Sequence, residues 1–182
     1  MNYTIMKNYK NFKTQKEKST ISSSRMIAFC GVLIALAMVL SYLESLVPIS
    51  FAIPGIKLGL ANIVTIIALV KLGLKPALII SVGRVLLSGL LFGNPATIIY
   101  SMAGALLSIA VMFFVRKLKL LAITGTSVCG AVAHNLGQLI VAAVVIENTK
   151  IFYYMAVLSL SGIIAGILIG ILAGFVVKNI HL

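Results

Sequence analysis

Apolar residues gather in six runs that begin after a polar N-terminal stretch and are separated by short polar or charged connections. A helix that crosses a membrane needs about 20 apolar residues, with a range of roughly 17–25, and most of the runs approach or exceed this length. The pattern predicts an all-α membrane protein with six transmembrane helices in one bundle. The runs cover residues 26–46, 58–70, 76–92, 97–115, 121–146 and 151–177.

The second run is shorter than the others, and Pro54, Gly55 and Lys57 precede it. We expect either a helix that starts irregularly near Pro54 or a re-entrant loop that leads into a short helix. Irregular backbone is tolerated at membrane depth only where protein or a water-filled cavity surrounds it. We therefore expect this segment to lie inside the bundle, where protein or a water-filled cavity surrounds its backbone.

Composition supports a membrane protein, because 61% of the residues are hydrophobic and the mean hydropathy is +1.17. Soluble domains are about 45–50% apolar. We expect one bundle over residues 25–182 and a disordered, basic cytoplasmic tail over residues 1–24, which are rich in Lys and Ser. A signal peptide is the competing interpretation, but the first run of about 21 residues exceeds the roughly 7–15 of a cleaved segment.

The formal net charge of +12 does not indicate nucleic-acid binding, since no folded basic face exists to carry it. When successive connections are assigned alternately to the two sides of the predicted bundle, most basic residues fall on one side. This distribution matches topology signals and contacts to the lipid bilayer. One side receives Lys57, the neutral turn at 93–95, Glu147 and Lys150. The other receives the tail, Lys71, Lys75, Arg116, Lys117, Lys119 and Lys178. This bias predicts a multi-pass protein of the cell membrane with both termini in the cytoplasm.

Two strips of small residues predict close helix packing, because small side chains let two backbones approach each other. The strip in the last run has a glycine at every fourth position, and we expect it to pack within the bundle or against another protein. The strip in the first run also fits internal packing, or a groove for a partner helix. The two strips are Gly162, Gly166, Gly170 and Gly174, and Ala28, Gly31 and Ala35.

Arg84 lies in the middle of the third apolar run. A guanidinium at the centre of a bilayer costs at least about 2.5–3.5 kcal/mol. The residue therefore requires a partner, a water-filled cavity or a ligand, and it is the first candidate for a functional site.

Seven further polar residues lie at the centre or in the predicted outer half of the runs. Their shared depth predicts one pocket open to the outside, which binds a small molecule. With Arg84 they form the candidate substrate-binding set: Glu44, Lys57, Asn62, Asn94, His134, Asn135 and Gln138.

The charges of this set favour a carboxylate or phosphate ligand, although a neutral ring bound by Asn and Gln side chains also fits. Structural roles are the alternatives. Arg84 can pair with Glu44 or with helix carbonyls, and His134, which shares a helical face with Gln138, can hydrogen-bond between helices.

No pattern of residues indicates catalysis, a metal or a cofactor, so we expect no enzyme activity. Cys30 and Cys129 each lie alone in an apolar run and fit packing positions. Prenyl diphosphate synthesis needs aspartate clusters to hold magnesium, and the sequence contains no Asp.

Several blocks of the sequence resemble a bacterial membrane family called both "Gx transporter" and "heptaprenyl diphosphate synthase component I". These blocks are SYLESLVP at 41–48, PGIKLGLAN at 54–62, RVLL at 84–87, LFGN at 91–94 and AVAHNLGQ at 131–138. The family is similar to the substrate-binding S components of energy-coupling factor transporters, six-helix proteins with an outward pocket.

The resemblance implies a binding subunit for uptake of a small nutrient such as a vitamin, powered by a separate coupling subunit and ATPases. In S components a small-residue motif on the first helix docks the coupling subunit. Gly31 and Ala35 match that motif, with Gly in place of the usual first Ala. The alternative is a non-catalytic membrane subunit of a polyprenyl diphosphate synthase.

Overall fold

The computed structural model describes residues 23–46 and 59–179, which form six α helices, one short 3-10 helix and no strands. Lys57 and almost all of the predicted tail lie outside the described residues, whereas Ser23 and Ser24, predicted as tail, belong to the first helix. The elements are α2 (Ser23–Leu46), α4 (Asn62–Lys71), α5 (Leu74–Phe92), α6 (Pro95–Lys117), α7 (Ile123–Ile146), η1 (Thr149–Tyr154) and α8 (Met155–Asn179).

The prediction of an all-α membrane bundle is confirmed, because five helices are long and apolar enough to cross a membrane. The sixth, α4, has 10 residues, which is about 15 Å at 1.5 Å per residue. The hydrocarbon core of a bilayer is about 30 Å thick. The second predicted span is therefore a short helix in the described part of the chain, and it does not cross a bilayer by itself.

Glycines bound α4 on both sides. Gly59 and Gly73 have φ angles of +72° and +93°, a backbone conformation that glycine adopts without steric cost. At the far end, the amides of Leu72 and Gly73 both donate to Ala68 O. These bonds occupy a carbonyl that the helix itself leaves open, and the chain turns directly into α5.

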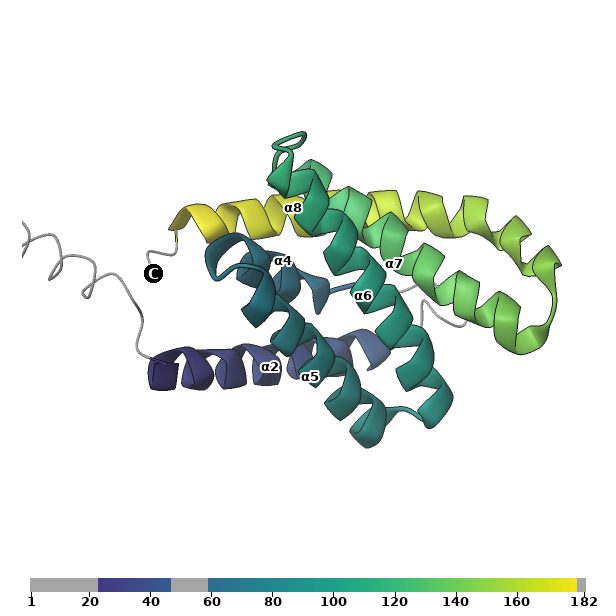
Figure 1. Cartoon of the computed structure of the whole chain (residues 1–182), viewed down its shortest axis with the longest axis horizontal. Coiled ribbons are helices and arrows are strands. Elements are labelled where there is room, and N and C mark those ends of the chain that lie inside the picture. Colours follow the sequence, from purple (N-terminus) through teal and green to yellow (C-terminus); the bar gives the residue numbers. More distant parts are fainter. Residues whose placement is uncertain (1–22, 47–58, 180–182) are drawn as a thin grey trace, which may run out of the picture.

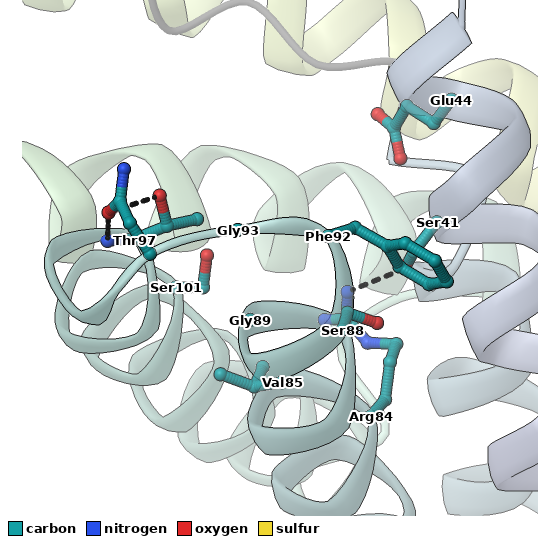
Figure 2. A pocket seen from close by; sticks show the side chains of 11 residues that line it. Ser41, Glu44, Arg84, Val85, Ser88, Gly89, Phe92, Gly93, Thr97 and Ser101 are labelled. Carbon is teal, nitrogen blue, oxygen red and sulfur yellow. Dashed lines mark hydrogen bonds between the residues drawn. The ribbon is translucent and has the colours of Figure 1, made fainter.

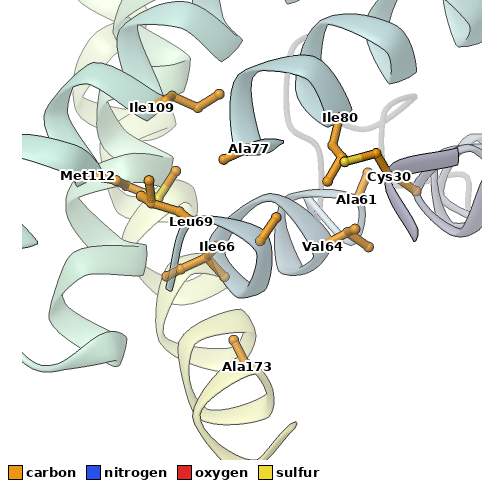
Figure 3. Close-up of a cluster of buried hydrophobic side chains, with 12 residues drawn as sticks. Cys30, Ala61, Val64, Ile66, Leu69, Ala77, Ile80, Ile109, Met112 and Ala173 are labelled. Atoms are coloured by element: carbon orange, nitrogen blue, oxygen red, sulfur yellow. The ribbon is translucent and has the colours of Figure 1, made fainter. Parts of the chain in front are cut away.

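α4 lies at the centre of the bundle and contacts α2, α5, α6 and α8. Its buried residues include Val64, Ile66 and Leu69, which pack against Ile80 of α5 and Met112 of α6 (Figure 3). This surrounding protein provides the shelter that a helix too short to cross a bilayer requires.

α6 and α7 approach each other backbone to backbone. A Cβ atom added to Gly137 would lie 2.8 Å from Ala103 O and 2.9 Å from Gly104 Cα. A Cβ on Gly104 would in turn lie 2.8 Å from His134 O. Only glycine permits so close a crossing, and this crossing fixes where α6 meets the polar residues of α7.

The glycine strip of α8 packs on α7 along three of its four positions. A Cβ on Gly162, Gly166 or Gly170 would come within 2.6–2.9 Å of α7 atoms, including Val128 Cα. Whereas its contact with another protein stays a prediction, Gly174 does not pack within the bundle, because a Cβ there would meet nothing within 4 Å. The reason is length: Gly170 already lies against Thr124, close to the start of α7.

α2 borders the other side of the bundle, where it contacts α5 and, to a smaller extent, α4. It runs antiparallel to α8, so the start of α2 and the end of α8 lie at the same end of the molecule (Figure 1). The small residues Ala28, Gly31 and Ala35 are exposed. The interpretation of this strip as internal packing is therefore wrong for the described structure, and its role in partner docking stays a prediction.

Candidate functional site

A cavity of about 420 Å³ lies between α2, α5 and the beginning of α6. Two of the predicted binding residues, Arg84 and Glu44, face it from different helices, as Figure 2 shows. The lining mixes hydroxyl, amide and charged groups with glycine backbone and one aromatic ring. It consists of Ser41, Glu44, Arg84, Val85, Ser88, Gly89, Phe92, Gly93, Asn94, Thr97 and Ser101.

Arg84 uses little of its hydrogen-bonding capacity within the described structure. Its Nη1 donates to Ser41 Oγ over a long 3.4 Å (Figure 2). Its Nε and Nη2 atoms, and Ser88 Oγ one helical turn away, are buried and find no hydrogen-bond partner among the described residues. Buried polar groups are normally satisfied, so these three atoms mark unused hydrogen-bonding capacity at residues that line the cavity.

Glu44 faces the same cavity, and its Oε1 accepts a hydrogen bond of 2.5 Å from the amide of Gly59. This bond ties the end of α2 to the residues that lead into α4. Neither Arg84 Nε nor Arg84 Nη2 bonds the carboxylate. The guanidinium and the carboxylate interact electrostatically, and the hydrogen-bonding capacity of these two nitrogens stays unused within the described structure.

Asn94 has a structural role in addition to its place in the cavity lining. It is the N-cap of α6, and its Oδ1 accepts from Thr97 N at 2.8 Å and from Thr97 Oγ1 at 3.0 Å. Such a cap satisfies amides that the first turn of a helix leaves open. Pro95, the first residue of α6, follows it and fits this helix start.

A second, small hollow of about 50 Å³ lies on the other side of the charged pair. Glu44 and Arg84 line both hollows, and the second one adds Asn62, His134 and Asn135. Asn135 Nδ2 donates to Leu158 O of α8 at 2.7 Å, so this side chain joins two helices. The two hollows thus bring together six of the eight predicted residues, with Asn62, Asn94, His134 and Asn135 joining Arg84 and Glu44.

Gln138 does not line either hollow, although it shares a helical face with His134. The cause is the position of α6, whose Gly104 packs between the two side chains. A Cβ on Gly104 would lie 2.9 Å from Gln138 Cγ and 3.0 Å from His134 Cε1. Gln138 instead lines a third cavity between α6, α7 and η1.

The sequence analysis missed the small hydroxyl residues of the cavity. Ser41 precedes Glu44 by three positions, Ser88 follows Arg84 by four, and Ser101 follows Thr97 by four. Each spacing places the hydroxyl residue on the same helical face as a cavity residue. That spacing is the signal that identifies them.

Among the described residues, no three His, Cys, Asp or Glu side chains are grouped so that they could hold a metal ion.

The model of the family described as heptaprenyl diphosphate synthase component I matches residues 33–176. This range begins inside α2, ends inside α8 and contains every residue of the three cavities. No curated protein and no solved structure matches the chain. Because the match covers most of the sequence, the chain belongs to the family of heptaprenyl diphosphate synthase component I.

Proposed function

We propose that this chain is the substrate-binding membrane subunit for uptake of a small molecule that carries a carboxylate or a phosphate. The observation that carries the proposal is that Arg84 and Ser88, which both line the main cavity, hold buried polar atoms without a hydrogen-bond partner among the described residues: Arg84 Nε, Arg84 Nη2 and Ser88 Oγ. An arginine presents its N–H groups in a planar fork that matches a carboxylate or phosphate.

The size and position of the cavity support this proposal. Its volume of about 420 Å³ lies within the roughly 300–1,000 Å³ typical of small-molecule sites, which suits a nutrient of vitamin size. It opens where α2 and α5 end and α6 begins, and the charge bias of the loops predicts that this end faces the outside. Energy would come from separate ATPases through a coupling subunit docked on the exposed strip of α2.

Binding measurements on the purified full-length chain test the proposal. The chain in nanodiscs is titrated with vitamins, flavins and small organic acids and phosphates, and Arg84→Ala and His134→Ala are compared with Arg116→Ala at the end of α6. Because hydrogen bonds to a charged group are worth about 1.5–3 kcal/mol, we expect Arg84→Ala to weaken binding by roughly tenfold to a hundredfold. Unchanged affinity in both cavity variants would contradict the proposal.

The family itself favours a second candidate, a non-catalytic membrane subunit that acts with a polyprenyl diphosphate synthase. The description "component I" implies a partner synthase subunit. Co-purification from the native host separates the two functions. Recovery of an ATPase pair with its coupling protein supports uptake, whereas recovery of a soluble, Asp-rich synthase supports the second candidate.

A further inference from the structure

We infer that the ligand is amphiphilic, with an anionic head at Arg84 and an apolar part in the cavity between α6, α7, η1 and α8. This inference rests on the proposed function and names the class of its ligand. It is carried by the way two cavities of opposite character adjoin along one face of α6.

The second of these cavities has a volume of about 530 Å³, and we call it the apolar cavity. Aliphatic side chains make up half of its lining, and Leu139 and Leu158 are buried there. Two tyrosines, one glutamine and two hydroxyl residues complete it. The lining is Thr97, Tyr100, Ser101, Gln138, Leu139, Ala142, Ile146, Ile151, Tyr154 and Leu158.

Thr97 and Ser101 line both the main cavity and the apolar cavity. They lie one turn apart on α6, and Figure 2 shows them on the opposite side of the main cavity from Glu44. Because the two cavities share these residues, a ligand that reaches from Arg84 past Thr97 and Ser101 meets the lining of the apolar cavity.

The apolar cavity lies on one side of the backbone crossing of α6 and α7. Gly104 and Gly137 meet at the crossing, and the α6 residues of the cavity, Thr97 to Ser101, all precede it. The α7 residues, Gln138 to Ile146, all follow it. The cavity therefore lies on the Asn94 side of the crossing, the same end as the main cavity.

Water-soluble amphiphiles and membrane lipids share this chemistry, so the probes must distinguish them. The full-length chain in phosphatidylcholine nanodiscs is titrated with inorganic phosphate and with butyl, hexyl and octyl phosphate, and with the carboxylates of the same lengths. Empty nanodiscs give the partition of each probe into lipid. A further set of nanodiscs contains phosphatidic acid, which competes with octyl phosphate only when the bilayer itself supplies the ligand.

The critical variant is Ala142→Trp, which fills the apolar cavity. Its matched control is Val144→Trp on the same helix, where the wild-type side chain is 71% exposed and lies outside the cavity. Arg84→Ala removes the site for the head. Each buried methylene contributes enough for about a fourfold gain in affinity. We expect this gain in the wild type and in Val144→Trp, and its loss in Ala142→Trp with inorganic phosphate binding unchanged.

The possible failures are distinguishable. Binding that requires Arg84 but does not increase with chain length, or increases equally in Ala142→Trp, overturns the amphiphile inference and leaves the proposed function standing. If no phosphate or carboxylate binds in a way that requires Arg84, the proposed function fails and the inference fails with it. Competition by phosphatidic acid supports the inference and assigns the ligand to the bilayer.

Discussion

Helices α7 and α2 differ in how closely their neighbours approach them. Along α7, glycines of α6 and α8 lie directly against the helix, and the nearest atom to a Cβ on Gly166 would be the backbone atom Val128 Cα at 2.7 Å. Where α2 meets α5, the nearest atom to a Cβ on Gly83 would be Ile34 Cδ1 at 2.9 Å, the end of a flexible side chain. Only Cys30 and Ala37 are buried among the described side chains of α2.

This difference divides the bundle into two parts. We call α6, α7 and α8 the frame, and the other part consists of α2 and α5, which border the main cavity. α6 and α8 each meet α7 through backbone contacts that cannot adjust without moving a helix. α2 and α5 meet through side chains that have room to change, and the main cavity lies between them. Glu44 and Arg84 thus belong to the adjustable half, whereas Asn135 belongs to the frame.

The largest effect is expected when a single methyl group is added inside the frame. Gly166→Ala places a Cβ 2.7 Å from Val128 Cα, so α7 and α8 must separate, and we expect a loss of about 2–3 kcal/mol in the free energy of unfolding. Equilibrium unfolding in mixed micelles measures it. Gly174→Ala is the matched control on the same helix, because nothing lies within 4 Å of its Cβ. It should gain about 0.5–1 kcal/mol from helix propensity.

Equal stability changes in these two variants would mean that the frame is not built on backbone contact. A third variant, in α2, tests the comparison between the two regions. Gly31→Ala, in the exposed strip of α2 with nothing within 4 Å of its Cβ, should behave like Gly174→Ala.

The elements of the bundle could be predicted from the sequence because apolar runs and helices coincide in a membrane protein. The runs 76–92 and 97–115 correspond to α5 and α6, which extend them by at most two residues at each end. In the sequence, the neutral turn at 93–95 only separates these two runs, whereas in the structure Asn94 and Pro95 start α6. α4 was recognisable as irregular because its run is short.

The packing partners could not be predicted in the same way. In the sequence, Gly166 and Gly174 belong to the same four-residue repeat, so both are expected to pack against a helix. Only Gly166 does so in the structure, because α7 begins at Ile123 and does not extend as far as Gly174. Likewise, one helical face carries both His134 and Gln138. The crossing of α6 at Gly104 places them in different cavities, and nothing in the spacing of α7 reveals where α6 crosses.

The hydroxyl residues of the main cavity were hidden for a chemical reason. A serine in a helix can satisfy its own hydroxyl with a backbone carbonyl of the preceding turn, so it gives no sign of a site in the sequence. Arg84 has no such local solution, which is why it could be identified as a candidate from the sequence alone.

An intermediate effect is expected where α2 is tied to the start of α4. Gly59→Ala forces a non-glycine residue to a φ of +72°, at a cost of about 1–2 kcal/mol. The added Cβ would also lie 3.3 Å from Asn62 Nδ2 and from Ile169 Cδ1. We therefore expect lower stability together with weaker ligand binding, since the Gly59 amide would no longer hold Glu44 in place.

Gly73→Ala is the control for this prediction, because Gly73 has a φ of +93° and nothing within 4 Å of an added Cβ. It carries the backbone strain without crowding the site. Thermal unfolding should show a loss in both variants, and ligand titration should show weaker binding in Gly59→Ala alone. Equal ligand affinity in the two variants would mean that the Glu44–Gly59 hydrogen bond does not contribute to ligand binding.

The smallest effect is expected at the point where the frame borders the site. Asn135→Ala removes the donor to Leu158 O, but that carbonyl also accepts from Ser161 Oγ at 2.9 Å. Polar bonds between membrane helices average about 0.6 kcal/mol, so we expect a loss of that size in unfolding free energy. Ser161→Ala should cost a similar amount. The double variant should lose more than the sum, because each donor partly replaces the other at one acceptor.

Ligand titration of the same Asn135→Ala variant then decides which half of the molecule this residue serves. A residue of the frame lowers stability and leaves the affinity within about twofold, since Leu158 and Asn135 act between α7 and α8. A tenfold loss of affinity at unchanged stability would instead place the amide at the ligand. The division between a rigid frame and an adjustable site would then no longer hold at the small hollow that Asn135 lines with Arg84.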